Sequence, residues 1–348
     1  MSIAISDQND RNHTADNRPV ALVTGATGAV GPLIVKAILA KGYRVRTLSL
    51  DPPSTEDWPT EVETRLGDVT DTVTVKAAMK NAEVVVHLAA LLHIIDPVPA
   101  LQKKYERVNV GGTANVVETA CRSGVKKILY FSTIAVYGPS LGRILSEDTP
   151  PQPDTYYAKT KLAAEKIVLE AKDSGGRTIG TVLRLGSVYG ARMKGNFQRL
   201  VSSLAQGRFI PIGKGLNRRT LIYERDVPRA ALLALEHPAA RGKVFNVSDG
   251  CFHTINEIIL TIAQALGKKA PKWSLPLGPI RNLTGLIEAF YLWIDRQPPI
   301  RRATLEKYTE DMAVDSQRFR NELGFFPEYD LRRGWREAVQ EMRSTGVL

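Results

Sequence analysis

The sequence has little of what builds disulfide frameworks, metal sites or membrane spans. Only two of its 348 residues are cysteines, Cys121 and Cys251, and their wide separation suits neither a metal ion nor a disulfide network. No cluster of histidine, cysteine and aspartate predicts a metal, so we expect none. No run reaches the roughly 18 to 20 uncharged apolar residues that cross a bilayer, so we expect no transmembrane segment. These shortages favour a protein of the reducing cytoplasm.

Basic residues outnumber acidic ones, but they form no nucleic-acid-binding arm. The formal net charge is +11 and the isoelectric point is about 9.6. The basic residues are spread in short pairs, such as Lys126-Lys127 and Arg218-Arg219, without interleaved aromatic residues. We therefore predict no nucleic-acid partner. Two explanations of the charge stay open: an ordinary solvated surface, or attraction of phosphate groups on a cofactor and a substrate.

After a polar beginning, the chain alternates strand patterns with helical ones. Residues 1–18 lack the apolar core of a secretory signal, and we expect a disordered tail there. The alternation from Val20 onward predicts an α/β fold of the Rossmann type, a doubly wound parallel sheet with helices on both faces. The expected strands lie at 20–23, 45–50, 84–88, 127–132, 181–185 and 244–247, and the expected helices at 32–40, 108–123 and 157–171.

In the last third of the chain the strand signal fades and helical patterns dominate. We predict a dinucleotide-binding domain at 19–190 plus 220–252, and a smaller, mostly helical substrate-binding lobe at 191–219 plus 253–348. Within this lobe, apolar residues of the segment 280–294 recur at steps of three and four, as on one helical face. We expect this face to pack on the body of the protein, with docking on a membrane surface as the alternative. The face consists of Ile280, Leu283, Ile287, Phe290 and Ile294.

A glycine-rich turn joins the first expected strand to the first expected helix. Gly25, Gly28 and Gly31 stand three residues apart in this turn. Small residues let the backbone turn tightly and approach a pyrophosphate, which then meets the free N–H groups of the helix N-terminus. Glycines at this spacing also arise by chance, so the prediction depends on the strand before them and the helix after them. The predicted dinucleotide-binding residues are Gly25, Thr27, Gly28, Ala29, Val30 and Gly31.

The end of the second expected strand bears on the choice of dinucleotide. In many sites an acidic residue there holds the ribose 2′-hydroxyl of NAD. Ser49 fills that place here, and Asp51 follows two residues later. We predict that Asp51 binds the ribose of NAD. Arg44 or Arg46, meeting the 2′-phosphate of NADP, is the alternative.

Asp68 and Val69 follow a probable third strand. The Asp68 carboxylate suits the amino group of adenine, so we predict that both residues contact the cofactor. The same stretch also suits a helix N-cap, at Thr70 or Asp71. The two roles are compatible.

Tyr157, Lys161 and Thr133 form a constellation for proton transfer. Of eleven tyrosines, Tyr157 alone has a lysine four residues later, which places both on one helical face. Thr133 ends the preceding strand, beside the start of that helix. A tyrosine with a pKa near 10 is a poor base at neutral pH, whereas a neighbouring ammonium favours the phenolate. We predict that Tyr157 exchanges a proton with a secondary alcohol, that Lys161 lowers the pKa of Tyr157, and that Thr133 holds the substrate oxygen.

Together these motifs resemble the extended short-chain dehydrogenase/reductases, the NAD-dependent epimerase/dehydratase superfamily. The resemblance runs from about residue 20 to 338. It implies an NAD cofactor, catalysis by the Thr/Tyr/Lys set, a supporting role for Asn109, and cofactor contacts by Leu88, Ala89 and Ala90. Relatives are often dimers through two helices of each subunit, which implies a homodimer. The segments that carry the family resemblance are Gly25/Gly28/Gly31, Asp68-Val69, His87-Leu88-Ala89-Ala90, Thr133, Val136-Tyr137-Gly138 and Tyr157-Ala158-Lys159-Thr160-Lys161.

Three features bear on the substrate. Ile134 and Ala135 stand where similar 4,6-dehydratases carry acidic residues, which disfavours elimination of water. Arg219 resembles the basic residue that nucleotide-sugar epimerases place on the nucleotide, since a guanidinium suits phosphate, and Asn196 is a second substrate-binding candidate. Ser187 stands where those epimerases usually carry asparagine, and this segment is equally similar to hydroxysteroid and flavonol-type reductases.

These features leave three functions open. The expected one is an NAD(P)-dependent epimerase or dehydrogenase that acts on a nucleotide sugar. The alternative is a hydroxysteroid-dehydrogenase-like or ketone-reductase-like enzyme for a lipophilic alcohol. A non-catalytic cofactor-binding protein is the third, and the intact Thr133, Tyr157 and Lys161 argue against it.

Overall fold

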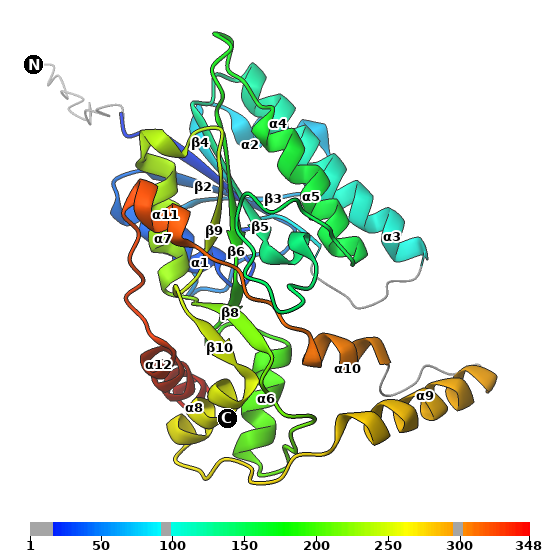
Figure 1. Ribbon diagram of the computed structural model, residues 1–348. Coiled ribbons are helices and arrows are strands. Elements are labelled where there is room, and N and C mark those ends of the chain that lie inside the picture. Colours follow the sequence, from blue (N-terminus) through cyan, green and yellow to red (C-terminus); the bar gives the residue numbers. More distant parts are fainter. Residues whose placement is uncertain (1–16, 92–98, 295–301) are drawn as a thin grey trace, which may run out of the picture.

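The computed structural model describes residues 17–91, 99–294 and 302–348, so the predicted tail at 1–18 lies almost wholly outside it. A seven-stranded parallel sheet runs through the molecule in the order β3-β2-β1-β4-β5-β6-β9 (Figure 1). The first six follow the order of a doubly wound dinucleotide-binding sheet, which confirms the predicted fold class. The strands are β1 (Val20–Thr24), β2 (Arg44–Ser49), β3 (Glu63–Leu66), β4 (Ala82–His87), β5 (Lys127–Thr133), β6 (Gly180–Leu185) and β9 (Val244–Val247).

Helices cover both faces of this sheet, which explains why its inner strands are continuous apolar runs. All five residues of β1 are buried. One face packs against α1, α7 and α11, and the other packs against α2, α4 and α5 (Figure 1). Their bounds are α1 (Gly31–Ala40), α7 (Asp226–Glu236), α11 (Gln317–Leu323), α2 (Thr72–Met79), α4 (Thr113–Arg122) and α5 (Tyr156–Leu169).

The carboxyl ends of three neighbouring strands meet at one edge of the sheet. In the β1–β4 pairing, Thr24 lies opposite His87, and in the β4–β5 pairing His87 lies opposite Tyr130. Three residues after Tyr130, β5 ends at Thr133. The turn after β1, the loop after β4 and the end of β5 therefore lie together, at the edge where doubly wound sheets bind ligands.

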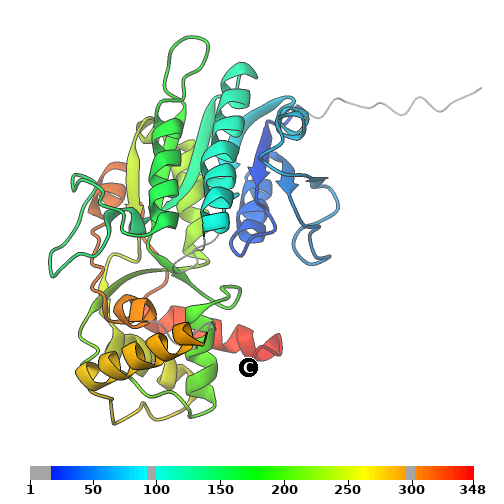
Figure 2. The same cartoon turned by 90° about the vertical axis from the view of Figure 1, so that its right-hand side faces the viewer.

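A smaller, mostly helical region lies beyond this edge (Figure 2). It contains a three-stranded sheet in the order β10-β8-β7, which the sequence did not predict because β7 and β10 have only three residues each. β8 crosses the predicted domain boundary at 219/220 and belongs to this smaller sheet. The elements that pack together here are β7 (Ser187–Tyr189), β8 (Arg218–Tyr223), β10 (Phe252–Thr254), α6 (Asn196–Ala205), α8 (Ile255–Leu266) and α12 (Leu331–Ser344).

The predicted helix at 108–123 is divided in the structure. α3 (Pro99–Tyr105) leads into a π-helical stretch, Glu106–Gly112, and α4 begins only at Thr113. A π-helical turn inside a helix is uncommon and often accompanies a functional site. Here it contains the buried Asn109. Two short 3₁₀-helices, Ile134–Tyr137 and Pro238–Ala240, complete the connections near the sheet.

The helix predicted at 280–294 is present as α9 (Leu277–Trp293), but its predicted packing is only partly right. Ile280 and Ile287 are half-buried, whereas Leu283 and Ile294, also expected to face the body, are 53% and 37% exposed. Figure 1 shows α9 extending away from the sheet, with α10 (Arg302–Thr309) beside it. Thr284, at 5% exposed, lies on the protein side of α9 in place of Leu283.

Candidate active site

The turn after β1 has the geometry of a pyrophosphate cradle. Gly25 has φ +69°, and a Cβ atom there would lie 2.6 Å from the Cα of Ala89, so only glycine fits. A Cβ on Gly31 would lie 2.0 Å from the carbonyl oxygen of Ala26. Because glycine has no side chain, α1 can begin directly against the turn. No side chain caps the first turn of α1, which begins directly after this turn and is the kind of helix start that suits an anion. The residues present therefore fit a dinucleotide phosphate.

The other predicted residues of this turn lie around the same cradle. The backbone N–H of Thr27 donates to the Ser49 hydroxyl (3.3 Å), which joins the turn to the end of β2. The carbonyl of Ala29 accepts from Arg192 of the smaller region (3.4 Å). Gly28 donates to the Gly25 carbonyl (3.0 Å), and Val30 is the N-cap residue of α1.

The structure separates the NAD and NADP alternatives at β2. Asp51 is exposed just beyond the end of β2, at the carboxyl edge. Arg46 is buried and donates to Glu63 (2.7 Å) and to the carbonyls of Ala78 and Lys80. Arg44 is the first residue of β2 and lies at the opposite edge of the sheet. Neither arginine is placed for a 2′-phosphate, so the NADP alternative drawn from them is wrong.

The stretch after β3 combines both predicted features. The Asp68 carboxylate accepts the N–H of Thr70 (2.8 Å), and Val69 is buried. Asp71, rather than Thr70, is the N-cap of α2 and accepts the N–H of Val73 (3.0 Å). The helix-cap interpretation is thus confirmed for Asp71, and the cofactor contact of Asp68 and Val69 stays a prediction.

Asn109 connects the loop after β4 to the catalytic helix candidate α5. Its side-chain oxygen accepts the N–H of Leu91 (2.7 Å), and its amide nitrogen donates to the hydroxyl of Thr160 on α5 (3.1 Å). Thr160 in turn donates to the carbonyl of Tyr157 (2.9 Å). Because Asn109 is fully buried, these bonds fix the loop of Leu88, Ala89 and Ala90 relative to α5.

His87 is a neutral structural residue at the end of β4. Its ring nitrogens bond Thr24 Oγ1 (2.6 Å) and Thr113 Oγ1 (3.0 Å). Since Thr113 donates its own proton to the Asn109 carbonyl, it accepts from His87 Nε2, and Nδ1 accepts from Thr24. Burial and the nearby charge of Lys161 lower the pKa of His87 to about 3. His87 therefore takes no part in proton transfer at neutral pH.

The predicted Thr/Tyr/Lys constellation lies at the carboxyl edge. Thr133 ends β5, and its hydroxyl accepts the N–H of Ala135 (3.1 Å). Tyr157 is the second residue of α5, whose N-cap is Thr155. Lys161 follows one turn later and is 2% exposed. α5 packs directly against β5, so the three residues share one region of the molecule.

The two ionisable groups of this constellation have strongly shifted pKa values. Burial lowers the pKa of Lys161 to about 7, against the opposing charge of Glu165. Burial, with a further contribution from Tyr105, raises the pKa of Tyr157 to about 12. The sequence predicted that Lys161 lowers the pKa of Tyr157. In this structure Lys161 Nζ donates to the Phe131 carbonyl (2.5 Å), so the effect of Lys161 on Tyr157 stays a prediction.

Sequence reasoning missed a buried ion pair behind this constellation. Glu165, one turn beyond Lys161, receives three hydrogen bonds from the Arg184 guanidinium, the shortest at 2.6 Å. Arg184 also donates to the Tyr137 hydroxyl (2.8 Å), which donates to Asn246 on β9 (2.9 Å). The spacing of residues 157, 161 and 165, each four apart, is a signal that could have identified Glu165.

Tyr105 is a second residue that the sequence did not single out. It is fully buried at the end of α3, and its ring centre lies 6.3 Å from that of Tyr157, edge to face. No spacing rule connects α3 with α5, so only the tertiary structure brings these rings together.

The two predicted substrate residues lie in the smaller region. Arg219, on β8, donates to the carbonyls of Lys307 and Tyr308 (3.1 Å to the latter) at the C-terminal end of α10. A cation there stabilises the helix terminus, so in this structure Arg219 is engaged by the protein itself. Asn196 is exposed at the first position of α6.

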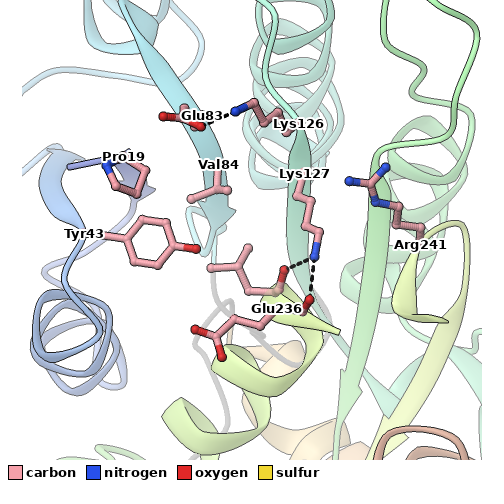
Figure 3. A pocket seen from close by; sticks show the side chains of 9 residues that line it. Pro19, Tyr43, Glu83, Val84, Lys126, Lys127, Glu236 and Arg241 are labelled. Atoms are coloured by element: carbon pink, nitrogen blue, oxygen red, sulfur yellow. Dashed lines mark hydrogen bonds and ion pairs between the residues drawn. The ribbon is translucent and has the colours of Figure 1, made fainter. Parts of the chain in front are cut away.

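The hollow in Figure 3 lies away from this constellation. It has a volume of about 320 Å³ and lies at the amino ends of β1, β4 and β5, the edge opposite Thr133. The two lysines that line this hollow already have partners in the protein. Lys126 forms an ion pair with Glu83, and Lys127 donates a hydrogen bond to the Glu236 carbonyl (3.0 Å). We therefore place the candidate active site at the carboxyl edge. No group of histidine, cysteine or acidic residues able to hold a metal occurs among the described residues.

Known proteins resemble this chain over nearly its whole length. The UDP-glucose 4-epimerase of Vibrio cholerae is 30% identical over 327 residues, covering 92% of this chain and 94% of that protein. A 3β-hydroxysteroid dehydrogenase/Δ5→4-isomerase of Mycobacterium tuberculosis (strain CDC 1551 / Oshkosh) is 24% identical over 330 residues, covering 91% and 89%. The structure of MoeE5 in complex with UDP-glucuronic acid and NAD superposes with a TM-score of 0.73 at 26% identity, covering 93% and 99%.

The family model for the NAD dependent epimerase/dehydratase family matches residues 21–248. This span contains the glycine turn, the loop after β4, and the Thr133, Tyr157 and Lys161 constellation. It confirms the predicted NAD-dependent epimerase or dehydrogenase of the extended short-chain dehydrogenase/reductase type, with NAD as cofactor. The chain belongs to the NAD dependent epimerase/dehydratase family.

Proposed function

We propose that this protein oxidises or reduces a secondary alcohol of a nucleotide sugar, as an epimerase or a dehydrogenase. The observation that carries the proposal is the position of Thr133 and Tyr157. They lie at the end of β5 and the start of α5, on the same edge as the Gly25 cradle. A bound NAD would accept or return hydride there, and these side chains would hold the reacting alcohol beside it.

Tyr157 is the proton donor and acceptor in this proposal. With a pKa raised to about 12, its phenol is protonated at neutral pH and suits donation to a carbonyl oxygen. Accepting a proton from an alcohol requires the pKa to fall. The nearest source is Lys161, whose ammonium, turned from the Phe131 carbonyl toward the phenol, would favour the phenolate. Thr133 would donate a hydrogen bond to the substrate oxygen.

The nucleotide sugar is supported by two relatives. The Vibrio cholerae relative is named for UDP-glucose, and MoeE5 holds a UDP-sugar with NAD. Arg219 meets a nucleotide phosphate in this proposal only after it releases the carbonyls of Lys307 and Tyr308. Its contact with α10 then makes the position of that helix sensitive to substrate. Asn196 would contribute from the first turn of α6.

A lipophilic alcohol is the second candidate. It is supported by the steroid-dehydrogenase relative and by the exposed leucines of α9. α10 connects this helix to the catalytic region, since Lys307 bonds Asp154 (2.7 Å), two residues before α5. Under this candidate, an apolar substrate would enter along α9.

The remaining expectations fit either substrate. We propose a cytoplasmic homodimer built on the helical face that contains α4 and α5. A groove of about 480 Å³ lies on this face, lined by Glu106, Val110, Tyr156, Lys159 and Ala163 among others. We also propose that the chain has two parts: residues 19–190 plus 220–252 bind the cofactor, and residues 191–219 plus 253–348 bind the substrate.

Thermal unfolding with combinations of ligands tests the function. The protein is unfolded with NAD or NADP, each with and without UDP. A ligand at a hundred times its Kd adds about 2.7 kcal/mol. We expect NAD to stabilise more than NADP, because Arg44 and Arg46 do not reach a 2′-phosphate, and we expect UDP to add to NAD. No response to either dinucleotide would contradict the family-based assignment.

A dinucleotide response that UDP leaves unchanged, with turnover of a sterol, would favour the second candidate. Epimerase and dehydrogenase are then separated by spectroscopy. Tightly retained NAD without net absorbance change at the NADH band indicates an epimerase, and net NADH formation indicates a dehydrogenase.

A further inference from the structure

Helix α9 presents a mixed face to the protein. Thr284 is 5% exposed, and Ile280, Ile287 and Glu288 are half-buried. Glu288 accepts the backbone N–H of Arg302 at the start of α10 (3.4 Å), and Gly285 lies against the Arg302 guanidinium. The ion pair of Arg281 with Glu306 of α10 (3.1 Å) is exposed. One side of α9 is therefore held by packing and by hydrogen bonds to α10.

The opposite face of α9 is apolar and uncovered in the part of the chain that the structure describes. Leu283 is 53% and Leu286 is 70% exposed. A surface helix of a globular protein normally presents the reverse arrangement, with leucines toward the core. Such an exposed apolar stripe marks an interaction surface.

The segment leading into α9 adds an interfacial aromatic and positive charge. Trp273 is 85% exposed, and Leu275 and Leu277 beside it are 39% and 36% exposed. Between residues 268 and 294 the sequence has four basic residues, Lys268, Lys269, Lys272 and Arg281, and one acidic residue, Glu288. Exposed tryptophan and leucine with adjacent lysines are the composition of helices that lie in the headgroup region of an anionic bilayer.

We infer that α9 and the segment before it dock this enzyme on an anionic membrane surface. The charge complementarity, with the exposed Lys269 and Lys272 in the segment before the apolar face and a chain of net charge +11, selects a lipid surface over an uncharged apolar partner. α9 lies on the surface rather than crossing it. Its 17 residues span about 26 Å, and none of the described helices is long and apolar enough to cross a bilayer.

Docking at α9 places the substrate end of the enzyme at the membrane. Figures 1 and 2 both show α9 and α10 on the same side of the smaller region. α10 in turn contacts Asp154, before α5, and Arg219, on β8. The inference goes beyond the proposed reaction and stands for either substrate class.

Vesicle flotation of the purified full-length protein tests the inference. Mixed phosphatidylcholine–phosphatidylglycerol vesicles are compared with pure phosphatidylcholine vesicles. We expect binding to the anionic vesicles that falls with added salt, and little binding to the neutral ones. A Leu283→Gln/Leu286→Gln variant should bind at least tenfold less. A Lys269→Gln/Lys272→Gln variant, which changes two exposed lysines, should lose binding on the order of tenfold.

The matched control is Val73→Gln/Leu260→Gln. These residues are 74% and 47% exposed on α2 and α8, away from α9. This variant should bind like the wild type, and all variants should keep the same NAD-induced rise in Tm. Equal binding of the wild type to both vesicle types, or an equal loss in the control, would overturn the inference. So would a wild type that forms a dimer through α9 and ignores vesicles, since a second copy would then cover this face.

Discussion

Helices α5 and α9 distribute their polar and apolar side chains in opposite ways. α5 buries Lys161 and Glu165 against the sheet, where Arg184 and backbone carbonyls bind them. α9 exposes Leu283 and Leu286, whereas Thr284 is buried. Each departs from the usual rule that leucine is inside and lysine is outside. The comparison teaches that a buried lysine and an exposed leucine have different meanings here. The buried lysine of α5 belongs to the candidate active site, and the exposed leucines of α9 belong to the inferred membrane-binding surface.

The largest effect that separates the two regions is expected at Tyr157. Tyr157→Phe removes the only exchangeable proton of the side chain. The kcat for the alcohol substrate should fall about 10³-fold, which corresponds to a rise of about 4 kcal/mol in the activation free energy. Tyr156→Phe is the matched control, because the neighbouring hydroxyl bonds Glu106 at the surface. The control should lose less than about threefold. Equal rates for both variants, measured at saturating substrate, would remove Tyr157 from the mechanism.

The buried charge on α5 predicts an intermediate effect on stability. The pKa of Lys161 is about 7 in the folded protein, against roughly 10.4 in an unfolded chain. Between these values the unfolded chain binds a proton that the folded protein has released. The free energy of unfolding therefore rises with pH from about 7 to about 10 by a few kcal/mol.

Urea unfolding of the cofactor-free protein at several pH values measures this dependence. Lys161→Met should remove the rise. The free energy of unfolding of the wild type should therefore increase relative to that of the variant as the pH is raised from about 7 to about 10. Lys159→Met changes an exposed lysine on the same helix and controls for the loss of one charge. Parallel pH curves for wild type and Lys161→Met would show that the lysine is fully charged in its buried site.

The cofactor end was predictable from the sequence because its requirements are local. Gly25 needs a positive φ and no Cβ, and Gly31 needs close contact between the turn and α1. The positive φ of Gly25 and the contact of Gly31 with Ala26 are local, so spacing reveals them. The clash of a Gly25 Cβ with Ala89 is a tertiary constraint that the spacing does not show. The four-residue interval from Tyr157 to Lys161 is equally local. The family match covers residues 21–248, which contain both segments.

The substrate end was not predictable, because its partners are distant in the sequence. Arg219 binds carbonyls at 307 and 308, which no periodicity connects with β8. The direction of the Tyr157 pKa depends on burial and on where Lys161 points, which only the folded chain determines. The α9 pattern correctly predicted a helix, but it did not reveal that Leu283 is exposed while Thr284 lies on the protein side.

The smallest expected effect belongs to the leucines of α9. Leu286→Gln should change the free energy of unfolding by less than about 0.5 kcal/mol, since glutamine matches leucine in helix propensity and no packing is lost. Leu183→Ala, at a fully buried position of β6, should lose about 2 to 5 kcal/mol in the same urea titration. A loss at Leu286 close to that at Leu183 would mean that this face is covered in the isolated protein. The near-neutral result would mean that Leu286 contributes nothing to folding, which leaves binding at the surface as the reason for an exposed leucine beside exposed lysines.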